Sequence, residues 1–226
     1  VFNDIIDREN DQAHPRKKNR PVASGQVSVR QATVISGLLF ALLILLSLSQ
    51  PVHQRLYLLV YIVISVSYTL ALRDIPVVDL FCIAAGFLVR LQFGGAVFGV
   101  PISEWLFLSV LFLAMFLSAG KRLNEQINLA KRASAHRRSL MAYPAGFLPG
   151  VMFMTGTSAL VTYSMYVVSR HALVYTIPLC CLGLFRFLQR AMAGKGGDPT
   201  ESLLRDPMIF TVGVIWTLMI GWGIYR

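Results

Sequence analysis

Residues 32–49 read ATVISGLLFALLILLSLS and contain no charged side chain. A helix needs about 20 predominantly apolar residues to cross the hydrocarbon core of a bilayer, so this stretch is long enough to span a membrane. Six further runs are similarly apolar: Leu56–Leu72, Leu80–Phe98, Trp105–Ala119, Phe147–Val168, Ala172–Met192 and Met208–Tyr225. The pattern predicts an all-α integral membrane protein in which seven helices span the bilayer.

The overall composition also indicates a membrane protein. Of the 226 residues, 55% are hydrophobic and only 14% are charged, which is too apolar for an ordinary soluble domain. The net charge of +10 is unevenly distributed, because most lysines and arginines fall in residues 1–31, 120–146 and 186–206, on one side of the predicted spans. By the positive-inside rule this side faces the cytoplasm, so the charge indicates orientation in a plasma (inner) membrane rather than binding to nucleic acid.

A cluster of acidic residues lies upstream of the first span. Asp4, Asp7 and Asp11, with Asn3 beside them, follow steps of three and four residues, which place the carboxylates on one face of a helix. Three like charges in such a row repel one another unless a cation lies among them. Mg²⁺ suits this arrangement, because it accepts one or two carboxylates and completes its coordination with phosphate oxygens. The alternative interpretation is an acidic helix end exposed to solvent.

Basic residues follow at once, in the stretch HPRKKNRPVASG at positions 14–25. Its prolines and its glycine break the helix and mark a turn before the first span. Lys17, Lys18 and Arg20 therefore lie on a loop that can fold back over the acids and bind the phosphate oxygens that a metal leaves free. A plain cytoplasmic anchor is the alternative for these bases. Acids, metal and bases together predict a binding site for a polyphosphate.

The motif NDIIDREND at residues 3–11, followed by this basic loop, resembles the first aspartate-rich motif of the UbiA-type intramembrane prenyltransferase superfamily. The resemblance covers essentially the whole chain and implies a bundle of nine transmembrane helices around a central cavity. The chain begins with Val rather than Met, so we expect about two N-terminal helices to be missing from this sequence. Residues 1–226 then form one UbiA-like transmembrane domain, in which residues 1–31 and 120–146 are the two cytoplasmic catalytic loops.

The second loop departs from the usual pattern of the superfamily. Most members carry a second aspartate-rich motif there, which binds the diphosphate of a prenyl donor, whereas residues 119–144 (AGKRLNEQINLAKRASAHRRSLMAYP) contain no aspartate. The patterns G-K-R-x-x-E and R-x-S-L-x-x-Y in this segment, together with residues 87–108 and 197–207, resemble the decaprenyl-phosphate phosphoribosyltransferases of arabinan precursor synthesis for the cell wall. This resemblance implies that Mg²⁺ binds the diphosphate of phosphoribosyl diphosphate and that a polyprenyl (decaprenyl) phosphate is the acceptor.

The resemblance also implies roles for residues in and near this loop. Lys121 and Arg122 would contact phosphate, and Glu125 would orient one of them or meet a ribose hydroxyl. Their spacing also allows a plain salt bridge. Arg137 is a further candidate for phosphate binding, and Tyr143 is equally compatible with substrate contact and with the interfacial aromatic belt. An anionic acceptor phosphate needs no general base, and no histidine lies beside a serine or cysteine in a way that suggests a triad.

Arg90 lies inside an apolar span, where a charge costs several kcal/mol unless it is paired or faces a cavity. We expect it to face the central cavity and to meet the acceptor phosphate or the sugar phosphate. The alternative is a structural ion pair with Asp79 or Asp74. In the last cytoplasmic loop, the stretch GKGGDP at residues 194–199 is expected to form a flexible turn, and Asp206 is expected to cap the final span.

Two other functions remain open on sequence grounds. An ordinary prenyltransferase would move a polyprenyl chain from a prenyl diphosphate to an aromatic acceptor such as 4-hydroxybenzoate, and the missing second aspartate motif argues against it. A transporter or channel would explain the spans but not the acids spaced beside the basic loop. We therefore expect a Mg²⁺-dependent phosphoribosyltransferase at the cytoplasmic face, whose partners are the lipid phosphate, phosphoribosyl diphosphate and the bilayer. A homo-oligomer is compatible with this interpretation.

Overall fold

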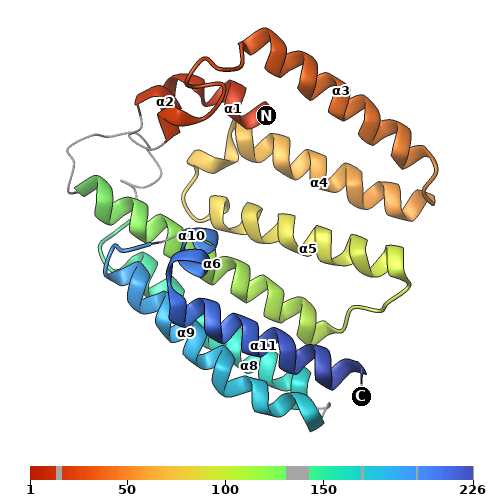
Figure 1. The fold of residues 1–226 in the computed structure, drawn as a ribbon. Coiled ribbons are helices and arrows are strands. Elements are labelled where there is room, and N and C mark those ends of the chain that lie inside the picture. The colour runs from red at the N-terminus through yellow and green to blue at the C-terminus, as the bar shows by residue number, and fades with distance from the viewer. Residues whose placement is uncertain (14–16, 131–142, 169–170, 197, 226) are drawn as a thin grey trace. The chain divides into compact units, whose positions relative to one another are not determined.

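The computed structural model describes residues 1–13, 17–130, 143–168, 171–196 and 198–225, which form helices joined by turns, without a strand among them (Figure 1). These residues belong to two compact units, Val1–Leu70 and Ala71–Arg226. The predicted all-α class is confirmed in both units. That the two units make up one domain, as the sequence suggests, stays a prediction.

In the described part of the first unit, the helical segments are α1 (Phe2–Ile6), α2 (Arg8–Ala13), the 3-10 turn η1 (Lys17–Asn19), α3 (Val29–Leu48) and α4 (Val52–Leu70). A capping box starts α3. The Ser28 hydroxyl accepts from the Gln31 N–H at 3.2 Å, and the Gln31 side chain accepts from the Ser28 N–H at 3.0 Å. These bonds satisfy N–H groups that the start of a helix leaves unpaired, and they fix where the apolar run begins.

In the described part of the second unit, the helical segments are η2 (Leu72–Asp74), α5 (Val78–Phe98), α6 (Glu104–Ala130), α8 (Phe147–Val168), η3 (His171–Thr176), α9 (Ile177–Met192), α10 (Pro199–Arg205) and α11 (Pro207–Tyr225). α6 packs against α5, α8 and α9, and α9 also packs against α11 (Figure 1). The start of α5, the end of α6, the start of α8, the end of α9 and α10 lie at one end of this unit, which we name the polar end.

The core of the second unit lies between α6, α8 and α9. The rings of Phe116 and Phe187 have centroids 5.4 Å apart, and Met152 is fully buried in the same cluster. Gly120 permits this packing, because a Cβ at that position would lie 2.6 Å from a ring carbon of Phe187. The glycine of the G-K-R pattern therefore lets α9 approach α6 closely, just before the charged residues of that pattern.

The structure contains fewer candidate membrane spans than the sequence predicts. Among the described residues, the helices long and apolar enough are α3, α5, Glu104–Asn128 of α6, α8 and Leu173–Met192 of η3 and α9. A sixth is counted if α10 and α11, which are bent by 95° to each other, form one span. The seventh prediction, Leu56–Leu72, corresponds to α4, whose first turn carries the polar residues His53, Gln54 and Arg55. The prediction of seven spans is therefore corrected to five or six, and the multi-span helical class is confirmed.

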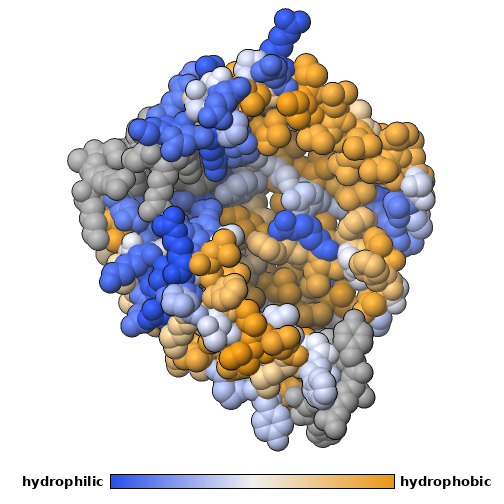
Figure 2. All heavy atoms as spheres, in the orientation of Figure 1, coloured by the Kyte–Doolittle hydropathy of each residue, from blue (hydrophilic) through white to orange (hydrophobic). Residues whose placement is uncertain are grey.

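The distribution of polar and apolar side chains agrees with this assignment. In the first unit, apolar side chains cover the visible face of α3 (Figure 2). In the second unit, apolar side chains lie along α11 and hydrophilic ones gather around α10. The charged residues of the second unit thus concentrate at its polar end, which is where the predicted second catalytic loop begins and ends.

Candidate active site

The predicted acidic helix face is interrupted at Asp7. α1 ends at Ile6 and α2 begins at Arg8, with Asp7 between them at φ −86° and ψ 3°. The helical spacing continues across this point, because the Asp7 N–H donates to the Asn3 carbonyl at 2.9 Å and the Asp11 N–H donates to the Asp7 carbonyl at 2.8 Å. The prediction of one continuous helix is corrected to two short helices joined at the middle aspartate.

Arg20 links two of the predicted metal ligands. Its Nη1 lies 3.0 Å from Asp4 Oδ1 and 2.8 Å from Asp11 Oδ2. The side chain of Asp11 is 4% exposed, whereas those of Asp4 and Arg20 are 34% and 39% exposed. The basic loop therefore folds back over the acids, and a guanidinium lies between two carboxylates.

Hydrogen bonds fix the backbone of this basic loop. Gln12 Nε2 donates to the Ala23 carbonyl at 3.1 Å, and the Ser24 N–H donates to the Arg20 carbonyl at 2.8 Å. Ala23 and its neighbour Val22 are buried. The loop is thus anchored on both sides of the acid-binding arginine, while the arginine side chain itself is partly exposed.

The other predicted ligands from these loops are less completely described. Asn3 and Lys18 are exposed, so both are accessible to a ligand. The side chain of Lys17, and Arg137 in the second loop, lie outside the described residues. The binding roles of these four residues stay predictions.

The pair of carboxylates around Arg20 fits a hard cation. The described residues contain no group of three His, Cys, Asp or Glu side chains that could hold a metal ion. Mg²⁺ needs only one or two protein carboxylates when water and substrate phosphates complete its coordination. Because Asp4 and Asp11 already converge on one nitrogen, their oxygens can accept such an ion once the guanidinium moves aside.

A second cluster of charges, at the polar end, is buried. Arg122 on α6 is 2% exposed, and its Nε lies 2.6 Å from Oδ2 of Asp79, a fully buried residue in the first turn of α5. Nη1 of Arg122 donates to Glu125 Oε2 at 2.8 Å, and the Glu125 side chain is 26% exposed. Both residues lie on α6, which continues to Ala130, well past the predicted end of the span at Ala119. This guanidinium is placed to fix Glu125 rather than to meet a phosphate from solvent.

Tyr143 belongs to the same buried cluster. Its hydroxyl donates to Asp79 Oδ1 at 2.7 Å and accepts from the Val77 N–H at 2.7 Å. Burial, together with the neighbouring carboxylate of Asp79, raises the pKa of Tyr143 to about 12, so the hydroxyl stays protonated and remains a donor. Val77 has φ +70°, a conformation that a β-branched residue rarely adopts, and its N–H is held by this tyrosine. Tyr143 therefore joins the segment before α5 to the segment before α8.

Lys121 contacts a different part of the polar end. Its Nζ lies 3.3 Å from Asp198 Oδ2, and the two side chains are 44% and 43% exposed. Asp198 also accepts from the N–H groups of Thr200 and Glu201, and so caps α10 where the sequence predicts only a flexible turn. Burial acts to raise the pKa of Asp198, but hydrogen bonding from Glu201 and the charge of Lys121 lower it overall. Lys121 is held near α10 yet remains accessible to an anion.

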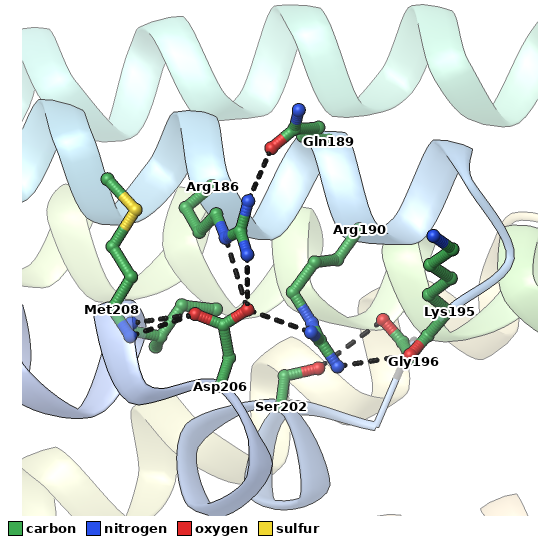
Figure 3. A network of polar contacts seen from close by, with 9 residues as sticks. Arg186, Gln189, Arg190, Lys195, Gly196, Ser202, Asp206 and Met208 are labelled. Atoms are coloured by element: carbon green, nitrogen blue, oxygen red, sulfur yellow. Dashed lines mark hydrogen bonds and ion pairs between the residues drawn. The ribbon is translucent and has the colours of Figure 1, made fainter.

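Asp206 organises a network that the sequence analysis did not predict beyond its helix cap (Figure 3). One of its oxygens accepts from the N–H groups of Met208 and Ile209 at 3.1 Å each, which confirms the predicted cap of α11. The other accepts from Arg186 and Arg190, each at 2.8 Å. Hydrogen bonding from Arg186 is the main cause that lowers the pKa of Asp206 to about 2. The spacing of four between the two arginines, on one face of α9, is the signal that could have predicted this network.

Arg90 is exposed on α5, about three helical turns beyond the buried Asp79. Its Nε donates to the Gly86 carbonyl at 3.1 Å, and its guanidinium carbon lies 4.4 Å from the centroid of the Phe87 ring. Asp79 and Asp74, the partners considered in the alternative interpretation, pair with other arginines. The alternative of a structural pair with these aspartates stays a prediction, as does the expected phosphate contact.

An open groove with a volume of about 400 Å³ adjoins this arginine, lined by Arg90, Leu91, Gly94, Gly95, Phe98, Val100 and Ile102. Gly95 is needed for local packing, because a Cβ there would lie 2.8 Å from the Val100 carbonyl oxygen. A Cβ on Gly94 would meet nothing within 4 Å, so this glycine leaves open space. One arginine at an otherwise apolar groove suits an amphiphile with an anionic head.

Comparison with known proteins identifies the family of this chain. A sequence model of the UbiA prenyltransferase family matches residues 1–212. A decaprenyl-phosphate phosphoribosyltransferase of Mycolicibacterium smegmatis is 30% identical over 240 residues, which cover 100% of this chain and 75% of the relative. The corresponding enzyme of Corynebacterium glutamicum is 28% identical, covering 100% of this chain and 71% of the relative.

A relative with a different name matches a smaller part of the chain. A 4-hydroxybenzoate octaprenyltransferase of Polynucleobacter asymbioticus is 25% identical over 161 residues, which cover 69% of this chain and 56% of the relative. The family match extends over almost the whole sequence and includes both charged clusters. With its several apolar helices, the chain is therefore a multi-pass membrane transferase that belongs to the UbiA prenyltransferase family.

Proposed function

We propose that this protein transfers a 5-phosphoribosyl group from phosphoribosyl diphosphate to a polyprenyl phosphate, decaprenyl phosphate in particular, and releases diphosphate. The observation that carries the proposal is the composition of the α6 terminus. Where most of the superfamily has a second set of aspartates, this chain has Lys121, Arg122 and Glu125, in a segment without aspartate. Relatives named decaprenyl-phosphate phosphoribosyltransferase match over the whole chain, which supports this assignment.

The reaction needs charge neutralisation and positioning more than proton transfer. An oxygen of the lipid phosphate forms a bond to the anomeric carbon of the ribose, and the bond from that carbon to the diphosphate oxygen breaks. The attacking oxygen is already anionic at neutral pH, so no side chain has to remove a proton. Both electrons of the broken bond leave with the diphosphate, whose growing charge must be stabilised.

The first unit carries the groups suited to the diphosphate. Asp4, Asp7 and Asp11 would hold Mg²⁺, which when bound supplies positive charge to the leaving diphosphate. Lys18 and Arg20 would bind the phosphate oxygens, Arg20 through its planar fork of donors. The short contacts from Arg20 to Asp4 and Asp11 support this grouping, because they bring acids and base to one place.

The polar end of the second unit offers two accessible charged groups. Lys121 is partly exposed and suited to a phosphate, and Glu125 is partly exposed and suited to a ribose hydroxyl. Arg122 acts in this proposal as a positioning residue for Glu125, because its guanidinium is buried between two carboxylates. Tyr143 in turn fixes Asp79, the buried partner of that guanidinium.

The groove on α5 is proposed to receive the lipid acceptor. Arg90 would contact the phosphate, and the apolar lining from Leu91 to Ile102 would contact the first isoprene units. The concentration of basic residues in alternate loops supports a cytoplasmic active site in a plasma (inner) membrane. Homo-oligomer formation stays a prediction.

Label transfer tests the proposed reaction. Membranes that contain the protein are incubated with Mg²⁺, a polyprenyl phosphate and phosphoribosyl diphosphate labelled in the ribose. We expect label in the organic phase, and we expect EDTA to abolish it. Absence of lipid label, combined with prenyl transfer from a prenyl diphosphate to 4-hydroxybenzoate, would contradict the proposal and favour the prenyltransferase alternative.

A further inference from the structure

We propose that Arg20 is an internal counter-ion that occupies the metal position until diphosphate arrives, and that it thereby couples the binding of Mg²⁺ to the binding of diphosphate. The inference rests on the proposed function for the identity of these two ligands. It concerns a single side chain with two roles, as partner of the carboxylates without ligand and as partner of the diphosphate with ligand.

The contacts of Arg20 define the first role. A single nitrogen, Nη1, lies within 3.0 Å of an oxygen from each of Asp4 and Asp11. A cation that bridges these same two oxygens would occupy the position of Nη1. Metal binding between the two carboxylates therefore requires the guanidinium to leave that position.

Burial explains why the acids need a counter-ion at all. The Asp11 side chain is 4% exposed, and a carboxylate with so little access to water is unstable without a neighbouring positive charge or hydrogen-bond donors. Arg20 supplies both through one contact at 2.8 Å. In its absence the acid would attract another cation, and a divalent ion is the strongest candidate.

Exposure explains how the guanidinium can leave. The Arg20 side chain is 39% exposed, whereas its carbonyl is fixed by the Ser24 N–H at 2.8 Å and the following residues Val22 and Ala23 are buried. The side chain can therefore rotate toward solvent while the loop backbone stays in place. The movement needed is a change of rotamer rather than an opening of the loop.

The balance of charge gives the coupling. A divalent cation added alone between Asp4 and Asp11 would place two cationic groups, the metal and the Arg20 guanidinium, beside each other. Diphosphate removes this repulsion, because its oxygens bind the metal and also accept hydrogen bonds from the displaced guanidinium. We therefore infer that the protein binds Mg²⁺ weakly by itself and tightly together with diphosphate.

Metal binding without turnover tests the inference. Purified protein in detergent micelles is titrated with Mn²⁺, a spectroscopic substitute for Mg²⁺, and free Mn²⁺ is measured by electron paramagnetic resonance with and without inorganic diphosphate. The variants are Arg20→Gln and the matched control Arg30→Gln, which removes the same charge from an exposed arginine in the first turn of α3 that has no proposed role in binding. Size-exclusion chromatography establishes that each variant is folded.

Arg20→Gln is expected to strengthen the binding of Mn²⁺ alone and to weaken the effect of diphosphate on that binding. Arg20→Gln should bind Mn²⁺ alone about tenfold more tightly than wild type, a change of about 1.4 kcal/mol. It should also lose most of the increase in Mn²⁺ affinity that diphosphate gives to the wild type. Arg30→Gln should keep that increase. Arg20→Lys retains a cation that can bridge the acids, and should bind Mn²⁺ alone as weakly as wild type.

Three outcomes would overturn the inference, and each is distinguishable from failure of phosphoribosyl transfer. If Arg20→Gln binds Mn²⁺ alone no more tightly than wild type, Arg20 does not compete with the metal. If Arg20→Gln is unfolded, tighter binding of Mn²⁺ alone by Arg20→Lys than by wild type contradicts the inference equally. If wild type binds no Mn²⁺ even with diphosphate, the metal site itself is wrong. Failure of phosphoribosyl transfer alone would overturn neither the role of Arg20 nor the metal site, because inorganic diphosphate is released in both transferase reactions considered.

Discussion

The ion pair between Arg20 and Asp11 in the first unit and the pair between Arg122 and Asp79 in the second unit have similar lengths, 2.8 Å and 2.6 Å, but opposite surroundings. The arginine side chain is 39% exposed in the first pair and 2% exposed in the second. In the sequence both arginines stand beside acids and suggest phosphate binding. The difference in exposure separates an arginine that can leave its carboxylate to bind a ligand, Arg20, from one that is fixed, Arg122.

The energetics of ion pairs explain this difference. In the first pair the arginine is exposed and can turn toward water, so it can exchange partners when another cation takes its place beside the buried Asp11. Breaking a buried pair by removal of one partner costs about 3–5 kcal/mol, because the remaining charge is left without compensation. The first cluster is therefore suited to bind and release substrate, and the second is suited to hold Glu125 and the helix ends in place.

The largest effect on activity is expected in the first unit. Asp7→Asn removes a predicted metal ligand and should lower turnover at least about 1000-fold, or about 4 kcal/mol, with normal membrane insertion. Glu9→Gln changes an exposed acid on α2 and serves as the control, with little expected effect. Rates of label transfer in membranes decide the matter, and wild-type turnover by Asp7→Asn would refute the metal assignment.

The largest effect on stability is expected in the second unit. Asp79→Ala leaves the Arg122 guanidinium buried without its closest partner and should lower the free energy of unfolding by about 3–5 kcal/mol. Arg20→Gln should lower it by less, because only one charge of that pair is buried and the glutamine amide can still donate a hydrogen bond to Asp11. Thermal unfolding in detergent compares the two variants directly, and equal losses of stability would remove the distinction between the clusters.

Acid should weaken the Asp206 network of the second unit. Its pKa is lowered from 3.8 to about 2 by Arg186 and the other donors. The charged carboxylate therefore stabilises the fold at pH values above the ordinary pKa of an aspartate. This contribution is complete above about pH 4 and is lost as the pH falls through about 2. The difference in unfolding free energy between wild type and Asp206→Asn should accordingly shrink over this range. A constant difference between pH 5 and pH 2 would contradict the assignment.

A smaller effect is expected at the proposed lipid groove. Gly94→Leu places a side chain in the groove from a position where a Cβ meets nothing within 4 Å, and should raise the KM for polyprenyl phosphate about tenfold with an unchanged KM for phosphoribosyl diphosphate. Gly37→Leu on α3 is the matched control, because a Cβ there also meets nothing within 4 Å. Steady-state kinetics with both substrates varied in turn test this, and an unchanged KM for the lipid would exclude the groove.

Helices and their caps could be predicted from the sequence because they depend on near neighbours in the chain. The predicted span Phe147–Val168 coincides with α8, and the predicted cap Asp206 accepts from N–H groups two and three residues ahead. The family could be identified from NDIIDREND because that motif is compact. These features need no knowledge of which helices lie side by side.

Partners distant in sequence could not be predicted in the same way. Arg122 and Asp79 are separated by 43 positions, and their contact depends on how α5 packs against α6. Tyr143 joins them only because the segment before α8 returns to the start of α5. The seventh span was overcounted for a related reason, since an apolar run does not reveal how many polar residues its helix will include at its start.

A competition between donors tests most directly whether the protein transfers a phosphoribosyl group or a prenyl chain. Membranes with the protein, Mg²⁺ and decaprenyl phosphate receive phosphoribosyl diphosphate, a prenyl diphosphate and 4-hydroxybenzoate together, and the lipid products are analysed by mass spectrometry. We predict a single new lipid whose mass is that of decaprenyl phosphate with a phosphoribosyl group attached, absent from membranes with Asp7→Asn. A prenylated aromatic acid, with unmodified decaprenyl phosphate, would contradict this account.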